Sequence, residues 1–199
     1  MATVQENALA EKKKELRQRM RNLRMHQDVA KATASSLAAQ KALLASPIWL
    51  KAGSVFLYQA TQGEIATDLL FADALASKKS VFFPRVRKNE CGLMDFVEVY
   101  GPDDLVSGAY GIMEPHPSLA RIAPEDYICD VAVIPGVAFS SMGARLGFGG
   151  GFYDRYFART RAKALVGFCY SFQMAEDLAI APWDVSMTHI CTECGLMAV

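Results

Sequence analysis

The sequence lacks the features that mark membrane, secreted or nucleic-acid-binding proteins. No apolar run approaches the roughly 20 residues that a membrane-spanning helix needs. Segment 1–24 is polar and then charged, without the hydrophobic core of a signal peptide, so we expect a cytoplasmic protein. The 199-residue chain has 21 Lys and Arg against 21 Asp and Glu, and this zero net charge gives no support for a nucleic acid or an acidic membrane as partner.

Cysteine is scarce and scattered. Five cysteines form an odd set without the spacing of a disulfide framework, which fits reduced thiols in a reducing compartment. Cys191 and Cys194 have the spacing of a redox or zinc half-site, with His189 nearby. A structural zinc site usually needs four ligands, and the other three cysteines are distant in the sequence, so this spacing alone does not establish a metal site.

Hydrophobic periodicity predicts an α/β protein. Hydrophobic residues make up 52% of the chain, which is typical of a globular protein with a core. Strands that alternate with helices predict a mostly parallel sheet with helices on both faces. The proline-rich segment 101–126 gives no clear pattern. We expect helices over residues 8–25, 28–46, 67–77 (with Thr67 as N-cap) and 151–160, and strands over residues 54–59, 80–86, 92–99, 130–139 and 164–170.

The stretch "ARLGFGGGFYDRYF" (144–157) places four glycines within five positions. It follows the strongest predicted strand and precedes a predicted helix, which is where ligands bind in open α/β sheets. Glycines there expose backbone N–H groups to a phosphate, Arg145 offers a guanidinium, and Asp154 is within reach of a cation such as Mg²⁺. The stretch is neither the dinucleotide fingerprint nor the P-loop, and a flexible surface turn would need the same glycines.

The predicted first helix carries a basic stripe. Lys13, Arg17, Arg21 and Arg24 lie on one side of it, one turn or so apart. Such a stripe either meets an anion or forms an ordinary solvated face. The sequence pattern leaves both interpretations open.

The segment "RLGFGGGFYDR" strongly resembles the signature of the 5-formyltetrahydrofolate cyclo-ligase family. Other segments similar to that family are "KKELRQRMR", "FLYQATQGEIAT", "VFFPRV", "YGIMEPHP" and "PWDVSMTHICTE". The resemblance implies a single domain over residues 1–199 with a three-layer α/β/α sandwich, Rossmann-like, around a mostly parallel central sheet. It also implies an ATP- and Mg²⁺-dependent ligase that converts 5-formyltetrahydrofolate to 5,10-methenyltetrahydrofolate.

The resemblance also implies roles for individual residues. Its expected catalytic residues are Lys13, Arg17 and Arg145, and its expected metal-linked residues are Asp154 and Asp184. Expected ATP contacts are Lys13, Arg17, Arg145, Leu146, Gly147, Phe148, Gly149, Gly150, Gly151, Phe152, Tyr153 and Asp154. Expected folate contacts are Leu57, Glu64, Tyr110, Gly149, Gly150, Gly151, Phe152 and Tyr153.

Three positions depart from the family pattern. Phe148 stands where arginine is frequent, and Ser140 and Thr188 stand where aspartates are common. They keep open a non-catalytic folate- or nucleotide-binding protein on the same scaffold, while a sugar-phosphate enzyme rests on fold analogy alone. Glu64 and Asp184 are also ordinary residues for a helix cap and a turn. We expect the two small-molecule substrates as partners and a monomer.

Overall fold

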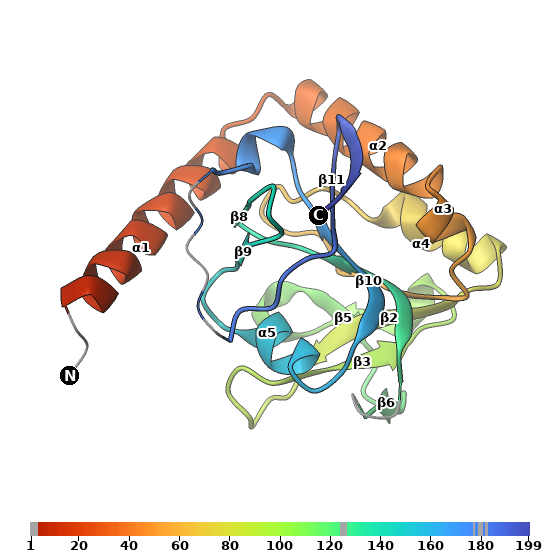
Figure 1. Ribbon diagram of the computed structural model, residues 1–199. Coiled ribbons are helices and arrows are strands. Elements are labelled where there is room, and N and C mark those ends of the chain that lie inside the picture. The colour runs from red at the N-terminus through yellow and green to blue at the C-terminus, as the bar shows by residue number, and fades with distance from the viewer. Residues whose placement is uncertain (1–3, 124–126, 177, 179–180, 182) are drawn as a thin grey trace.

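A mostly parallel sheet forms the centre of the protein (Figure 1). The computed structural model describes residues 4–123, 127–176, 178, 181 and 183–199, and within them one sheet has eight strands in the order β12-β11-β10-β7-β1-β2-β3-β6. The strands from β11 to β2 pair in parallel, and β12, β3 and β6 extend the edges antiparallel. Their bounds are β1 (Ser54–Phe56), β2 (Ser80–Val86), β3 (Met94–Glu98), β6 (Arg121–Ile122), β7 (Cys129–Ile134), β10 (Ala162–Phe168), β11 (His189–Thr192) and β12 (Gly195–Ala198).

Two short antiparallel pairs and several helices complete the described part of the chain. The pairs are β4 (Leu105–Ser107) with β5 (Met113–Pro115), and β8 (Ala138–Phe139) with β9 (Arg145–Leu146). The α-helices are α1 (Val4–Met25), α2 (Val29–Leu44), α3 (Pro47–Leu50), α4 (Asp68–Ala76) and α5 (Phe152–Phe157). The 3₁₀ turns are η1 (Pro102–Asp104), η2 (Ala109–Gly111) and η4 (Ser171–Gln173).

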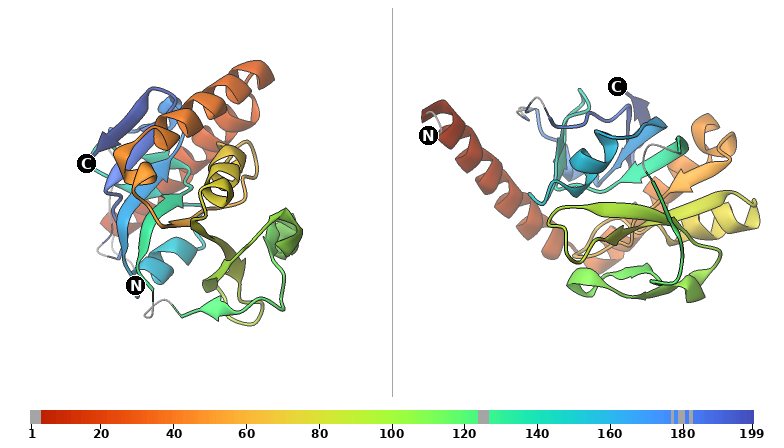
Figure 2. Two further views of the ribbon diagram at one scale, coloured as in Figure 1. Left: turned by 90° about the vertical axis from the view of Figure 1, so that its right-hand side faces the viewer. Right: turned by 90° about the horizontal axis from the view of Figure 1, so that it is seen from below.

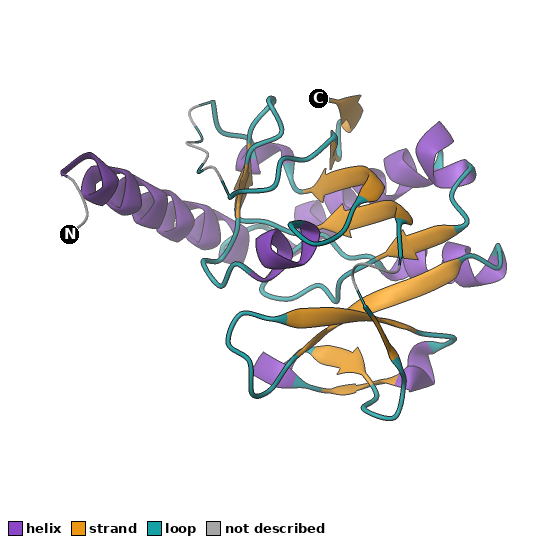
Figure 3. Cartoon of the chain, turned by 60° about the horizontal axis from the view of Figure 1, so that its bottom comes forward, coloured by secondary structure: helices purple, strands orange, loops and turns teal. Residues whose placement is uncertain are grey.

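Alternating side chains of the central strands pack into two hydrophobic clusters, one on each face of the sheet. On one face Val55 lies in a cluster with Leu43 of α2 and Leu70 of α4. On the other face Phe56 lies in a cluster with Tyr156 of α5. Parallel strands are covered on both faces in this way, so their residues are apolar without alternation. Figure 3 shows the strands side by side with helices on both sides, which confirms the predicted α/β/α layers.

The predicted strand over residues 130–139 is two strands in the structure. β7 ends at Ile134, because Pro135 has no backbone N–H to continue the ladder. A Cβ atom at Gly136 would lie 2.6 Å from the ring of Phe139, so the chain turns tightly at this glycine. The turn starts the separate pair β8–β9, which the sequence pattern did not predict, and this pair carries Arg145.

Other predicted elements are shorter than expected. The predicted strand 54–59 ends at Phe56, and the predicted helix 151–160 ends at Phe157. Thr67 is the N-cap of α4 as predicted, but its hydroxyl donates to the Tyr58 carbonyl instead of capping the helix. The proline-rich segment contains the β4–β5 hairpin.

The first helix lies partly against the body and partly away from it. Leu16 and Met20 of α1 pack with Val137 and Leu146 from the β8–β9 region. Figures 1 and 2 show that the N-terminal end of α1 extends away from the rest of the chain. Among the described residues, none of the helices combines the length and the apolar character that a membrane span requires.

Candidate functional site

A cavity of about 860 Å³ lies beside the carboxyl ends of β1, β2 and β7. This is the edge of the sheet where ligands bind in open α/β folds. Segments distant in the sequence surround it, namely the middle of α1, the turn that contains Glu64, the loop between β9 and α5, η2 and the segment around Asp184. The cavity is large enough for a drug-sized or nucleotide-sized ligand.

Almost all of the residues implied by the resemblance line this one cavity. They are Lys13, Arg17, Glu64, Tyr110, Arg145, Leu146, Gly147, Phe148, Gly149, Gly150, Gly151, Phe152, Tyr153, Asp154 and Asp184.

The exception is Leu57. Its side chain is fully buried in the hydrophobic cluster that includes residues of α2 and α4, and it does not line the cavity. The structure therefore provides no folate contact from this side chain. Tyr58, the next residue, belongs to the same cluster and also lines the cavity.

The glycine-rich loop (147–151) runs from β9 to α5. Gly149 and Gly151 have φ angles of 104° and 66°, a region that side chains with a Cβ atom rarely adopt. Gly151 is the N-cap of α5 and provides no side-chain cap. Because α5 has only six residues, its dipole is small, and the exposed loop amides and nearby cations are the main groups available to an anion.

The three expected catalytic cations all contact the loop or its neighbours. Nε of Arg17 donates to the Gly147 carbonyl at 2.9 Å, and Nζ of Lys13 lies 3.3 Å from Oδ2 of Asp184. These two contacts join α1 to segments far along the chain.

Arg145 is the most buried of the three cations, with 4% of its side chain exposed. Its Nη2 donates to Oδ1 of Asp154 at 2.8 Å, and its guanidinium carbon lies 5.5 Å from the centroid of the Tyr153 ring. Its Nε is buried and has no hydrogen-bond partner among the described residues. A buried charged group of this kind favours an anionic ligand in the cavity.

Two carboxylates, those of Asp154 and Asp184, line the cavity. Asp154 uses Oδ1 for Arg145 and for the Val185 amide, and Asp184 uses Oδ2 for Lys13 and for the Ala181 amide. Among the described residues, these contacts use only one oxygen of each carboxylate, and the second oxygen takes no part in them. The same part holds no group of three or more His, Cys, Asp or Glu arranged for a metal ion. Two carboxylates completed by phosphate and water are nevertheless an ordinary Mg²⁺ environment.

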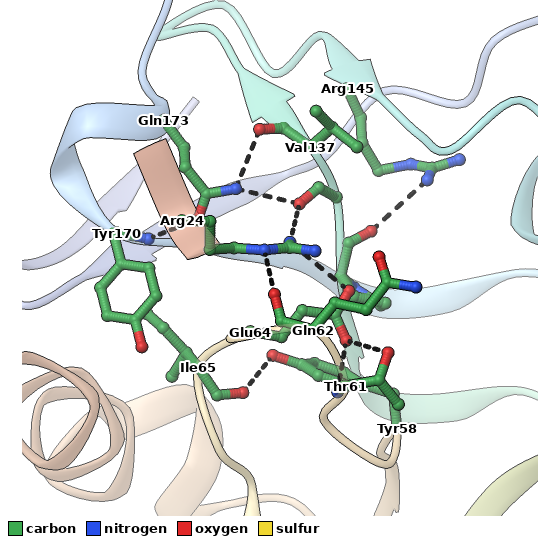
Figure 4. A network of polar contacts seen from close by, with 12 residues as sticks. Arg24, Tyr58, Thr61, Gln62, Glu64, Ile65, Val137, Arg145, Tyr170 and Gln173 are labelled. Atoms are coloured by element: carbon green, nitrogen blue, oxygen red, sulfur yellow. Dashed lines mark hydrogen bonds and ion pairs between the residues drawn. The ribbon is translucent and has the colours of Figure 1, made fainter. Parts of the chain in front are cut away.

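The Glu64 turn forms another wall, shown in Figure 4. Oε2 of Glu64 accepts from the Thr61 amide at 3.0 Å, so the carboxylate closes its own turn rather than capping α4. Burial raises the pKa of Glu64, against the hydrogen bonds from Thr61 and the charge of Arg24. Sequence reasoning did not predict that Tyr58 and Gln62 also line the cavity. The only sequence feature that could have indicated them is their position shortly before Glu64.

Only one of the three departures from the family pattern lies in the cavity. Phe148 lines it, whereas Ser140 and Thr188 do not. Oγ of Ser140 accepts from the Ala144 amide within the β8–β9 turn, and Oγ1 of Thr188 accepts from the Leu165 amide. These two departures serve backbone contacts away from the cavity.

A sequence model described as the 5-formyltetrahydrofolate cyclo-ligase family matches residues 9–193 of the chain. The chain belongs to this family. A probable 5-formyltetrahydrofolate cyclo-ligase from Caenorhabditis elegans is 30% identical over 94% of this chain and 95% of that protein. A 5-formyltetrahydrofolate cyclo-ligase from Haemophilus influenzae is 31% identical over 70% of this chain and 75% of that protein.

A solved structure supports the same family assignment. The NMR structure of 5,10-methenyltetrahydrofolate synthetase from Aquifex aeolicus has a TM-score of 0.81 at 34% identity, over 94% of this chain and 92% of that one. A 5,10-methenyltetrahydrofolate synthetase from Mycoplasma pneumoniae has a TM-score of 0.72 at 24% identity and shares the fold. The cavity described above therefore belongs to a cyclo-ligase fold.

Proposed function

We propose that this protein uses ATP to convert 5-formyltetrahydrofolate to 5,10-methenyltetrahydrofolate, with release of ADP and phosphate. The observation that carries the proposal is the single cavity in which α1, the glycine-rich loop, the Glu64 turn and Tyr110 meet. The family assignment over residues 9–193 supports the same reaction.

In the proposed reaction an amide oxygen is made into a leaving group. The formyl oxygen attacks the γ-phosphorus of ATP, and the bond to the β-phosphate oxygen breaks to give ADP. Nitrogen 10 then attacks the activated formyl carbon and loses its proton, and the C–O bond breaks to release phosphate. The protein must hold both substrates in line and neutralise charge on the transferred phosphoryl group.

We assign the nucleotide side of the cavity to the loop and the cations around it. The exposed amides of the glycine-rich loop face an anion without side chains in the way. Arg17 reaches the loop from α1, Lys13 of the same helix pairs with Asp184, and Arg145 offers a buried guanidinium whose Nε is unpaired within the described residues. Charge stabilisation of this kind acts most strongly where water is excluded.

Asp154 and Asp184 are the residues that would hold a magnesium ion. A bound ion would neutralise negative charge on the phosphate oxygens and help to orient them. Until a cation arrives, Arg145 and Lys13 balance the two carboxylates.

We assign the folate side to Glu64, Tyr110 and the aromatic start of α5. An ionised Glu64 accepts hydrogen bonds from N–H groups of the folate ring system, and Tyr110, Phe152 and Tyr153 offer flat apolar contacts. Tyr110 is 79% exposed and has a φ angle of 57°, which costs free energy for a residue with a Cβ atom. That conformation places its ring at the cavity edge.

The direct test is a turnover assay. The purified protein is incubated with ATP, Mg²⁺ and 5-formyltetrahydrofolate, and the absorbance of methenyltetrahydrofolate and the release of ADP are followed together. The proposal predicts product and ADP in equal amounts. Binding of both ligands by calorimetry without ADP release would instead support the non-catalytic alternative, whose one remaining observation in the cavity is Phe148.

Several expectations from the sequence remain predictions. They are the cytoplasmic location, the single domain over residues 1–199, the monomeric state and the absence of nucleic-acid and membrane partners.

A further inference from the structure

Arg24, near the C-terminal end of α1, forms a buried ion pair with Glu64. Its Nη1 lies 3.7 Å from Oε1 of Glu64, and the two side chains are 2% and 7% exposed. Arg24 does not line the cavity, whereas Glu64 does. Arg24 therefore contacts a residue of the cavity lining without being part of it, and Figure 4 shows the two side chains next to each other.

The same guanidinium also holds the backbone of two loops. Its Nε donates to the Gln62 carbonyl at 2.8 Å, and its Nη1 lies 3.5 Å from the Gly136 carbonyl. Gln62 and Gly63 have φ angles of 50° and 73°, so the turn before Glu64 is left-handed and costly for Gln62. The hydrogen bond from Arg24 to this turn offsets part of that cost and fixes where Glu64 emerges.

Arg24 also contacts the glycine-rich loop. Its guanidinium carbon lies 5.2 Å from the centroid of the Phe148 ring, within the range of a cation–π interaction. Its Nη2 is buried and has no hydrogen-bond partner among the described residues, so the ring is a compensating neighbour for this part of the charge. Phe148 is half-exposed and lines the cavity.

We propose that Arg24 is a positioning residue that holds the Glu64 carboxylate and the Phe148 ring in place for the two substrates. It does not line the cavity and acts through these two residues, which do. This inference rests on the proposed function, because it assigns the folate side to Glu64 and the nucleotide side to the loop.

Charge gives the inference a measurable consequence. Arg24 is the cation paired with Glu64, and the other titratable groups coupled to Glu64 are the buried phenols of Tyr58 and Tyr153. Burial raises the pKa of Glu64 and the charge of Arg24 lowers it. Removal of the Arg24 charge should therefore raise this pKa further, so that Glu64 becomes protonated at a higher pH, loses its negative charge and turns one acceptor oxygen into an O–H donor.

The test uses the full-length variants R24M and R24K, with R19M as the matched control on the exposed side of the same helix. Carbon-13 NMR of labelled Glu carboxyls follows the titration of Glu64, assigned by its loss in E64Q. We expect the R24M titration to move to higher pH, and R24K, which keeps a positive charge, to restore most of the unmodified behaviour. R19M should titrate like the unmodified protein.

Kinetics provide a second readout. R24M should raise the KM for 5-formyltetrahydrofolate by about tenfold, most strongly at acid pH, and the same change made in E64Q should raise it far less. A purely structural role would lower the melting temperature and leave the Glu64 titration in place. An unchanged titration in folded R24M, or equal losses in R24M and R24K, would overturn the inference.

The two hypotheses fail separately. If the unmodified protein makes no product, the proposed function is refuted, and the carboxyl titration alone then decides on Arg24. If product forms normally and R24M titrates like the unmodified protein, only the inference on Arg24 is refuted.

Discussion

Arg145 shows how a buried charge ties structure to function at the residue scale. Burying a guanidinium costs free energy that one ion pair with Asp154 does not fully return, because Nε has no partner among the described residues. Under the proposed function, an anionic ligand in the cavity would complete the arrangement around Arg145.

The first prediction concerns the substitution of Arg145. R145A should lower kcat by roughly 30- to 1,000-fold, corresponding to about 2–4 kcal/mol, because it removes a cation next to developing charge. The kcat is measured from methenyltetrahydrofolate absorbance at saturating substrates. R161A, which changes an exposed arginine, should behave like the unmodified protein. A folded R145A protein with near-normal kcat would remove the role assigned to Arg145.

Leu57 gives a second prediction at the same scale. Because its side chain lies in the core, L57A should lower the free energy of unfolding by about 2–5 kcal/mol, measured by urea denaturation. The KM for 5-formyltetrahydrofolate should stay the same. Y110A should show the opposite pattern. Because Tyr110 is exposed at the cavity edge, its substitution should raise the KM for 5-formyltetrahydrofolate and change the free energy of unfolding little. A large rise in KM in folded L57A would return Leu57 to the site.

Residue chemistry was predictable only in part. The spacing of Arg145, the glycines and Asp154 indicated a phosphate-type site, and all of them line the cavity. The sequence did not predict that Arg145 and Asp154 contact each other, because this contact depends on the unpredicted β8–β9 pair. The ion pair between Arg24 and Glu64 was also missed, since their stretches of sequence carry no signal of proximity.

At the scale of elements, the glycine-rich loop depends on conformations that only glycine adopts readily. A Cβ atom added at Gly149 would have no neighbouring atom within 4 Å, so there is space for a side chain. The constraint at this position is the φ angle of 104°, which residues with a Cβ atom rarely adopt. At Gly149 the requirement for glycine therefore comes from backbone conformation, whereas at Gly147 and Gly150 an added Cβ atom would lie within 3 Å of a neighbouring side chain.

A third prediction follows for this loop. G149A should raise the KM for ATP and lower the melting temperature, because alanine is strained at this φ angle by about 1 kcal/mol or more. G101A is the control, since Gly101 has an extended backbone and open space around its Cβ position. Steady-state kinetics and thermal unfolding measure both effects. Identical values for G149A and G101A would mean that the loop tolerates another conformation.

The elements themselves were predicted unevenly. The long periodic helices α1 and α2 and the buried strands β2 and β10 lie close to their predicted bounds. Strand ends were less accurate at β1 and β7, because apolar residues such as Leu57 and Val137 stay buried after the strand has ended. Periodicity follows burial and does not distinguish a strand from a buried loop.

At the scale of the whole molecule, the cavity depends on contacts between distant segments. The bond from Arg17 to Gly147 and the pair of Lys13 and Asp184 span 130 and 171 residues. The basic stripe alone was more typical of a solvated face than of an anion site. Its placement over the loop was implied only by the family resemblance, because periodicity does not say which surface a helix meets.

The most direct test of this arrangement is ATP binding, measured by calorimetry on the full chain. The account predicts that R17A weakens binding by roughly 10- to 100-fold, since it removes both a cation and the tie between α1 and the loop. R19A, on the exposed side of the same helix, should bind ATP like the unmodified protein. Equal affinities in R17A and the unmodified protein, or no ATP binding at all, would contradict the account.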